Sequence, residues 1–93
     1  MIRWLRRAER DLVHVEAYIA QDNPRAAVAM VLTIIEAVEQ LDAHPGMGRA
    51  GRVEGTRELV VAGTPYVVPY RQKGKWIEIL RVYHAARLWP EAF

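Results

Sequence analysis

Hydrophobic residues in the first half of the chain recur at helical spacing. Residues 2–5 form a short apolar run that suits a first strand. From Arg6 onward the apolar positions are separated by four, three and four residues, and charged residues fill most of the others. This pattern predicts an amphipathic helix that ends near Asp22. Its apolar face consists of Ala8, Leu12, Val15 and Ile19.

A second helix is expected to start directly after the first one. Asn23 is a residue type that caps helix N-termini, and Pro24 suits a first helical turn, where a missing N–H removes no hydrogen bond. Two amphipathic helices joined by so short a turn should pack antiparallel and share an apolar face that covers a sheet. The second apolar stripe consists of Ala27, Met30, Val31, Ile34, Val38 and Leu41.

The sequence after the second helix predicts a loop and then three strands. Pro45 and three glycines break any period between His44 and Arg52, so this stretch should be irregular. Pro69 conflicts with a regular middle strand, because proline has no N–H for a ladder and prefers an edge or a bulge. The short turns between the strands favour an antiparallel meander. The three strand-like runs are residues 57–61, 66–72 and 76–84.

The order of these elements is strand, helix, helix and three strands, which is an α+β fold. A chain of 93 residues fits a single domain, here residues 1–93, with one modest core. No window approaches the roughly 18 uninterrupted apolar residues of a membrane span. The N-terminus is charged but lacks an apolar segment with a cleavage site, so we expect a cytoplasmic protein with no membrane partner.

The amino-acid composition excludes several kinds of catalytic and metal site. The chain has no cysteine and no serine, which excludes disulfides, thiolate zinc sites, cysteine nucleophiles and a Ser-His-Asp hydrolase. It has no His-Glu-x-x-His, no paired Asp and no phosphate-loop motif, so we expect neither a metal site nor a cofactor. Any reaction would depend on oxygen, imidazole or guanidinium groups.

The net charge of +2 is unevenly placed along the chain. Residues 1–43 hold five Arg against seven Asp and Glu, a net charge of −2. Residues 44–93 hold eight Lys and Arg against four Glu, a net charge of +4. The strand-rich half is therefore the basic half. This asymmetry indicates either a polyanionic partner for the C-terminal half or an ordinary solvated basic surface.

Strand alternation suggests which of these side chains lie together. In the last run it puts Ile79, Arg81 and Tyr83 on one face. By the same rule, Arg57 and Tyr66 each lie on one face of their own strand. If the helices cover one face of the sheet, cations and tyrosines on the free face would form a groove for phosphates and bases. Whether they share that face depends on the strand register.

His84 is the candidate for proton transfer. It follows a strand, and the cations that bracket it favour the neutral imidazole that a general base needs near pH 7. The alternative is a strand-end histidine that caps a turn. The neighbouring arginines, and those of the loop, could also be ion-pair partners of glutamates or simple solubilising groups.

Three segments of the sequence carry a family resemblance. They are His-Pro-Gly-Met-Gly-Arg at 44–49, the strand-like runs between Gly55 and Pro90, and Arg-Val-Tyr-His-Ala-Ala-Arg at 81–87. With them the chain resembles the RelE/ParE superfamily of toxins from bacterial type II toxin–antitoxin modules, over nearly its whole length. The resemblance implies the same α+β order. It also implies a small cognate antitoxin that neutralises the toxin in a hetero-oligomer.

The superfamily contains two kinds of toxin. RelE-like members cut messenger RNA in the ribosomal A site without metal, by promoting attack of a ribose 2′-hydroxyl on the neighbouring phosphate. ParE-like members share the fold, lack that activity and poison DNA gyrase. Carried over by position, the resemblance gives four catalytic candidates, Arg57, Arg81, His84 and Arg87. The RNA-binding candidates are Arg49, Arg52, Tyr66 and Tyr83.

One position departs from the RelE-like pattern. Those nucleases often place an arginine directly after the tyrosine that opens the second meander strand, where this chain has Val67. We expect a growth-inhibiting, metal-independent and ribosome-dependent mRNA endoribonuclease. The alternative is a ParE-like, non-enzymatic inhibitor of DNA gyrase. A toxin fold that has lost its potency and only binds its partner is a third class.

Overall fold

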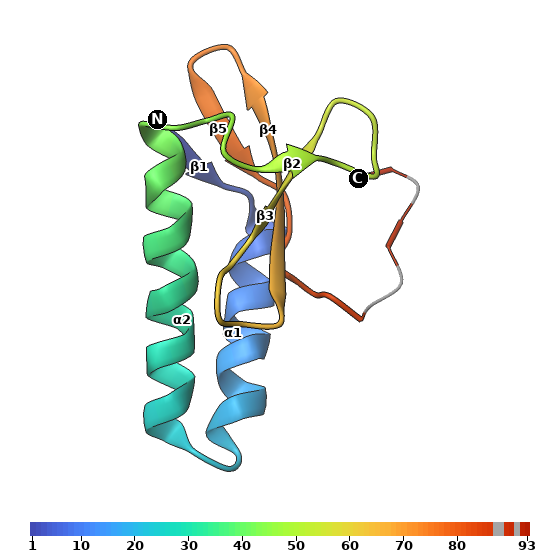
Figure 1. Cartoon of the computed structure of the whole chain (residues 1–93). Coiled ribbons are helices and arrows are strands. Elements are labelled where there is room, and N and C mark those ends of the chain that lie inside the picture. Colours follow the sequence, from blue (N-terminus) through green and yellow to red (C-terminus); the bar gives the residue numbers. More distant parts are fainter. Residues whose placement is uncertain (87–88, 91) are drawn as a thin grey trace.

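Two antiparallel helices form the N-terminal half of the molecule (Figure 1). Helix α1 spans Arg6–Ala20, and helix α2 spans Pro24–Glu39. A 3₁₀ turn over Gln40–Asp42 follows α2. The structure, a computed structural model, describes residues 1–86, 89–90 and 92–93.

Asn23 fixes the turn between the two helices as the sequence predicts. Its backbone is extended, and its side-chain oxygen accepts the N–H of Ala26 at 3.1 Å. Pro24 occupies the first turn of α2. The cap satisfies a backbone donor that would otherwise lack a partner at the helix start.

The described strands form one sheet against which the helices pack. Its order is β1-β5-β4-β3-β2, and β6 also pairs with β4. Strand β1 runs parallel to β5, and the other pairs are antiparallel. The expected α+β fold is confirmed. The stretch 44–52, expected to be irregular, contains the short strand β2, which pairs with β3, and the last expected strand is divided into β5 and β6. The strands span Ile2–Trp4, Arg49–Ala50, Arg57–Val60, Tyr66–Lys73, Trp76–Ile79 and Tyr83–His84.

The expected single strand over residues 76–84 is wrong, because a bulge divides it into β5 and β6. Ile79 lies opposite Tyr70, and Tyr83 lies opposite Val67. Between these pairs, three residues of the last strand face two residues of β4. One of the two is Pro69, whose carbonyl accepts the N–H of Leu80 at 3.0 Å but which returns no N–H. The bulge therefore lies where the proline interrupts the ladder.

The bulge reverses the faces expected for the end of the chain. Ile79 and Val82 both belong to the core between sheet and helices, although strict alternation puts them on opposite faces. Tyr83 lies on the other face, so the expectation that it shares a face with Ile79 is wrong. The core members are Ala8, Ile34, Val38, Leu41, Leu59, Val61, Tyr66, Val68, Tyr70, Ile77, Ile79 and Val82.

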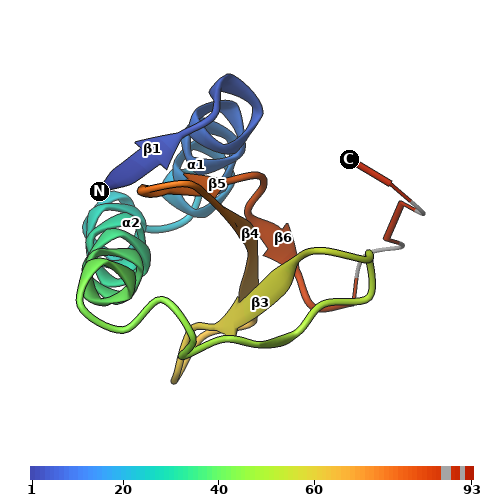
Figure 2. The ribbon, with the colours of Figure 1, turned by 90° about the horizontal axis from the view of Figure 1, so that it is seen from above.

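The face of the sheet away from the helices is not entirely free. Tyr83 is only 1% exposed, and its ring centroid lies 4.9 Å from that of Trp89 and 6.3 Å from that of Phe93. In Figure 2 the described residues of the C-terminal end lie beyond β6, on the side of the sheet away from α2. An aromatic cluster thus covers the β6 end of this face, which the sequence had predicted to be open.

A buried carboxylate joins α1 to the bulge. Asp11 is 8% exposed, and its two oxygens accept Nε and Nη2 of Arg81 at 2.7 and 3.0 Å. The N–H of Val82 donates to the same carboxylate at 2.9 Å. The bond to Asp11 raises the pKa of Arg81, against the opposite effect of burial. Three donors therefore compensate for the desolvation of Asp11.

A second buried carboxylate lies in a row across β1, β5 and β4. The register places Arg3 and Arg71 on either side of Glu78. Nε of Arg71 donates to Glu78 at 2.8 Å, and Arg3 approaches the other oxygen at 3.5 Å. The hydrogen bond from Arg71 is the main reason why the pKa of Glu78 lies below its usual value.

Replacing Asp11 with Asn should destabilise the fold. The change leaves the Arg81 guanidinium without a counter-ion in a largely buried position, so the free energy of unfolding should fall by about 2–4 kcal/mol. Urea unfolding followed by circular dichroism measures this. Glu16→Gln, an exposed change on the same helix, should alter it by less than about 0.5 kcal/mol. Equal midpoints for Asp11→Asn and wild type would contradict the role given to Asp11.

The stabilising effect of Glu78 should depend on pH. Because its pKa is lowered in the folded state, the ionised group stabilises the fold above its usual pKa of about 4.3. That contribution is lost as the pH falls through the folded-state pKa. The difference in urea midpoint between wild type and Glu78→Gln should therefore shrink between pH 7 and pH 3. Exposed Glu39→Gln should show a small difference at both pH values. A Glu78→Gln difference that is constant with pH would exclude this mechanism.

Candidate functional site

The candidate residues of the sequence do not converge on one site. Arg49, Arg52 and Arg57 lie at one end of the sheet, around the loop after α2. Tyr66 and His84 lie at the opposite end, beside α1. Arg81 is near this second group, whereas Arg87 lies outside the described residues. The two groups share one aromatic contact, because Arg52 lies 4.1 Å from the centroid of the Trp89 ring and Trp89 packs against Tyr83.

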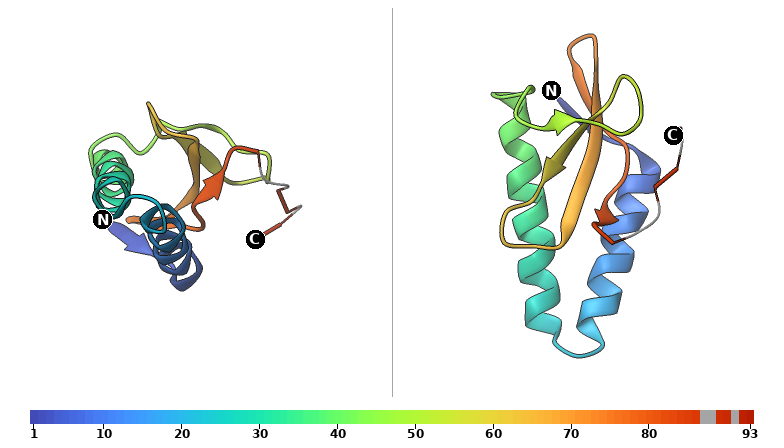
Figure 3. Two further views of the ribbon diagram at one scale, coloured as in Figure 1. Left: turned by 90° about the horizontal axis from the view of Figure 1, so that it is seen from below. Right: turned by 45° about the vertical axis from the view of Figure 1, so that its right-hand side comes forward.

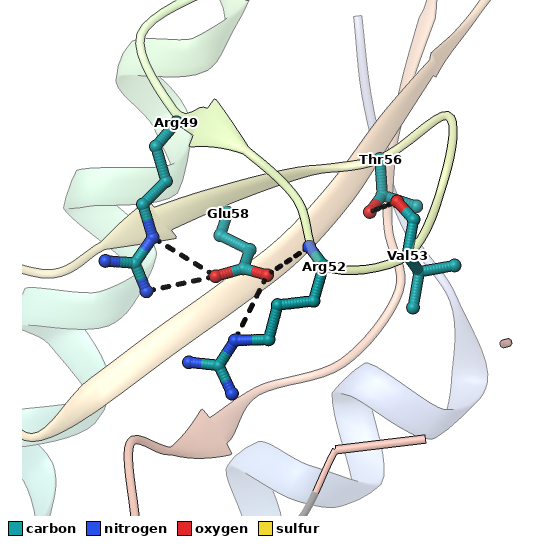
Figure 4. A network of polar contacts seen from close by, with 5 residues as sticks. All are labelled: Arg49, Arg52, Val53, Thr56 and Glu58. Carbon is teal, nitrogen blue, oxygen red and sulfur yellow. Dashed lines mark hydrogen bonds and ion pairs between the residues drawn. The ribbon is translucent and has the colours of Figure 1, made fainter. Parts of the chain in front are cut away.

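The loop arginines surround a buried glutamate (Figure 4). Glu58 is 2% exposed and lies on the sheet face away from the helices. One of its oxygens accepts Nε and Nη2 of Arg49 at 3.1 and 3.0 Å. The other accepts the backbone N–H of Arg52 at 2.8 Å, and the Arg52 Nε lies 3.7 Å away. Glu58 thus partly neutralises Arg49 and Arg52, whose side chains stay 54% and 48% exposed.

The His-Pro-Gly-Met-Gly loop is held by Tyr70. The Tyr70 hydroxyl donates to the carbonyl of Pro45 at 2.7 Å and accepts the N–H of Gly48 at 2.9 Å. A Cβ at Gly48 would lie 2.6 Å from the Tyr70 ring, so only glycine fits this close approach. Nη1 of Arg57 donates to the Gly48 carbonyl at 3.0 Å. Arg57 therefore contributes to fixing this loop.

Arg57 and Tyr66 both lie on the helix side of the sheet. The groove that the sequence suggested on the free face therefore does not contain these two residues. Arg57 is the register partner of Tyr70, and Tyr66 belongs to the core with it. The sequence could not reveal this because pairing decides which face of each strand packs against the helices. Burial, and then the nearby Tyr18, raise the pKa of Tyr66.

His84 is exposed and caps the turn that follows β6. Its Nδ1 accepts the N–H of Ala86 at 3.1 Å, so the neutral ring carries its proton on Nε2. The ring meets that of Tyr66 edge-on, with centroids 5.8 Å apart. Both rings line a shallow pocket of about 350 Å³ against Asp11, His14 and Tyr18 of α1. This is the turn-capping arrangement that the sequence left open as an alternative.

Arg81 and Tyr83 do lie together, as alternation suggested. The guanidinium carbon of Arg81 is 4.7 Å from the centroid of the Tyr83 ring. The charge of Arg81 is nevertheless paired with Asp11, a partner that was not among the carboxylates expected from the sequence. A signal was present: Asp11 follows Ala8 by three residues and precedes Val15 by four, so it lies on the apolar face of α1.

The separation of the two groups follows from the register. Arg57 lies opposite Tyr70 and His84 lies opposite Tyr66, on different sides of β4. Four residues along the strand and two strand spacings across it put their Cα atoms about 16 Å apart. Buried core side chains, including Val68, fill the space between them.

Two further observations limit the kinds of site present. Among residues 1–86, 89–90 and 92–93, no group of three His, Cys, Asp or Glu is placed to hold a metal ion. Neither α1 nor α2 is long and apolar enough to cross a membrane.

The chain is similar to proteins that are named as toxins and to a chain from a toxin–antitoxin system. The family described as "ParE toxin of type II toxin-antitoxin system, parDE" matches residues 2–89. "Putative toxin Y4kP" of Sinorhizobium fredii is 48% identical over 90 residues, which are 97% of this chain and 93% of that protein. "Toxin RelE2" of Caulobacter vibrioides is 40% identical over 85 residues, 91% of this chain and 94% of that one.

A solved structure agrees with these relatives. A chain of the chromosomal ParDE toxin–antitoxin system from P. aeruginosa superposes with a TM-score of 0.81 at 36% identity, covering 89% of this chain and 92% of that chain. This chain therefore belongs to the ParE family within the RelE/ParE superfamily and is the toxin of a type II toxin–antitoxin module.

Proposed function

We propose that the chain is a non-enzymatic toxin that binds and inhibits DNA gyrase. The main observation behind this proposal is that the side chains a nuclease would need are separated in space or already paired. His84 has its Nδ1 occupied by the turn, Arg81 is neutralised by Asp11, and the Cα atoms of Arg57 and His84 are about 16 Å apart. No single phosphate can meet all three groups, so charge stabilisation and proton transfer are not combined at one point.

The position of Val67 supports the same conclusion. This residue stands where RelE-like nucleases often have an arginine, and it is 3% exposed beside Tyr83. A cation placed there would be covered rather than presented to RNA. The family match to ParE toxins agrees with inhibition of gyrase, the activity of ParE-like members.

The proposed partner in the cell is a cognate antitoxin that forms a hetero-oligomer with this chain. The ParDE system of the similar structure supports such a partner. We propose that an extended antitoxin segment pairs with the outer edge of β3. Strand β2 pairs only with Arg57 and Glu58, so beyond Glu58 no described strand covers this edge. A groove of about 520 Å³ lies there, between β3 and the end of α2.

Val60 presents the backbone groups for this pairing. Val61 donates its N–H to Tyr66 at 3.1 Å, and in an antiparallel pair the neighbouring residue points its N–H and C=O the other way. The N–H and C=O of Val60 therefore face the groove. Its side chain is 50% exposed, so a partner strand has an apolar contact as well.

The target can be identified with two assays on the purified chain. We expect inhibition of DNA supercoiling by gyrase and no cleavage of messenger RNA on programmed ribosomes in EDTA. His84→Gln should inhibit gyrase within about threefold of wild type, because His84 has no catalytic role in this proposal. Ribosome-dependent cleavage that falls by about 10²- to 10⁴-fold in His84→Gln would instead make the chain a nuclease with His84 as its acid or base.

The antitoxin edge can be tested with a proline at Val60. Val60→Pro removes the N–H that faces the groove but no bond between β3 and β4, so antitoxin affinity should fall about tenfold or more. Val60→Thr keeps the N–H and the branched side chain and should bind within about threefold of wild type. Affinity is measured by calorimetry, and circular dichroism checks folding. A folded Val60→Pro that binds like wild type would exclude pairing at this edge.

A further inference from the structure

Cations without an ion pair gather along one side of α1. Arg6, Arg7 and Arg10 are exposed, and within the part of the chain that the structure describes they form no ion pair. His14 follows Arg10 by four residues, and Arg10 follows Arg7 by three, so these side chains lie on neighbouring turns. Sequence counting had placed the excess charge in the C-terminal half. There, however, Arg49, Arg52, Arg71 and Arg81 are all paired with buried carboxylates.

This side of α1 faces the β6 end of the sheet and forms a groove with it. Figure 3 shows β6 beside α1 in both views, and the bond from Val82 to Asp11 joins the two. Three adjoining hollows, each of about 340–350 Å³, follow one another along the helix and share lining residues. We call them together the α1 groove. Its polar and aromatic lining consists of Arg6, Arg7, Arg10, Asp11, His14, Tyr18, Tyr66, Arg71, Arg81, His84 and Phe93.

The α1 groove carries more positive charge than the whole chain. Five arginines line it, and among the described residues they pair with the carboxylates of Asp11 and Glu78 alone. The surplus is three positive charges, whereas the formal net charge of the protein is +2. A hollow lined by one sign of charge concentrates the field on a ligand of the opposite sign. The charge of this groove therefore favours an anionic ligand.

We propose that the α1 groove binds the phosphate backbone of DNA. Guanidinium forks match phosphate oxygens, and from Arg6 to Tyr18 the groove runs about 18 Å, enough for several phosphates. The Tyr18 side chain is 72% exposed at its far end, where a base can stack on the ring. The inference rests on the proposed function for the source of the strand, which is the DNA bound to gyrase.

An acidic protein segment fits the groove less well. Extended peptides gain much of their affinity from backbone hydrogen bonds to a strand edge. Here one wall is α1, whose backbone groups are bonded within the helix, and the other combines Tyr66 and Arg71 of β4, the bulge residues 80–82 and His84. The N–H groups of Leu80 and Val82 in that wall already donate to Pro69 and Asp11. A nucleic-acid strand needs no backbone partner, since cations and exposed aromatic rings supply its contacts.

The test is the affinity of the full chain for fluorescently labelled DNA, measured by anisotropy between 50 and 200 mM salt. The triple variant Arg6→Gln, Arg7→Gln, Arg10→Gln should bind single-stranded DNA at least tenfold more weakly. It should also reduce the slope of log K against log salt by about 2, as expected for three lost phosphate contacts. Tyr18→Ala should weaken single-stranded binding about fivefold and duplex binding less. The same measurement with RNA of the same sequence tests whether the groove recognises only the phosphate groups, which RNA and DNA share.

A matched control removes the same charge elsewhere. The triple variant Arg25→Gln, Lys73→Gln, Lys75→Gln alters exposed cations outside the groove and should change DNA affinity less than threefold. Urea midpoints confirm that both triple variants are folded. An equal loss in both variants, or polyglutamate binding that is stronger than DNA binding and is lost in the groove variant, would overturn the proposal.

The gyrase assay separates this inference from the proposed function. The groove variant should still bind gyrase subunits without DNA but inhibit supercoiling less. If the wild-type chain does not inhibit gyrase, the proposed function fails, and the DNA affinities still decide the groove. A groove variant that inhibits supercoiling and binds DNA like wild type overturns the inference alone.

Discussion

The ion pair between Asp11 and Arg81 is the contact on which the arrangement of helices and sheet depends. It joins residues that are 70 positions apart and fixes the bulge against the first helix. Because the same carboxylate also accepts the N–H of Val82, the backbone at the bulge is held in place along with the side chain. Val82 then points into the core, and Tyr83 points to the other face. One carboxylate thus sets the direction of the chain beyond β5.

The same principle recurs on the sheet. Glu58 and Glu78 are both buried, and each is paired with arginines from a neighbouring strand or loop. Removing charges from water is unfavourable unless they are paired and hydrogen-bonded, so these arginines are committed to the fold. The cations left to meet a partner are those without a buried carboxylate nearby, and α1 provides three of them. In this toxin, stability and recognition use different arginines.

Local features of the structure could be predicted from the sequence, and features set by pairing could not. The two helices and the Asn23 cap depend on neighbouring residues, and their spacing reveals them. The faces of Arg57, Tyr66 and Tyr83 depend on strand register and on a bulge, which join distant parts of the chain. Pro69 did indicate that bulge, because proline cannot donate to a strand ladder. The partner of Arg81 could also have been predicted, since Asp11 interrupts an apolar helix face. A count of charges missed it because such a count does not distinguish paired arginines from unpaired ones.

Arg81 also contacts the other side of the sheet, because its guanidinium lies over the Tyr83 ring that Trp89 covers. The same side chain lines the α1 groove. Any ligand that shifts Arg81 from one side therefore changes the free energy of the arrangement on the other side. If an anion that binds beside α1 changes the equilibrium constant for uncovering Tyr83, thermodynamic linkage requires that uncovering Tyr83 change the binding constant of the anion by the same factor. In this small toxin, Arg81 is thus a side chain shared by the α1 groove and the aromatic cluster on the other face.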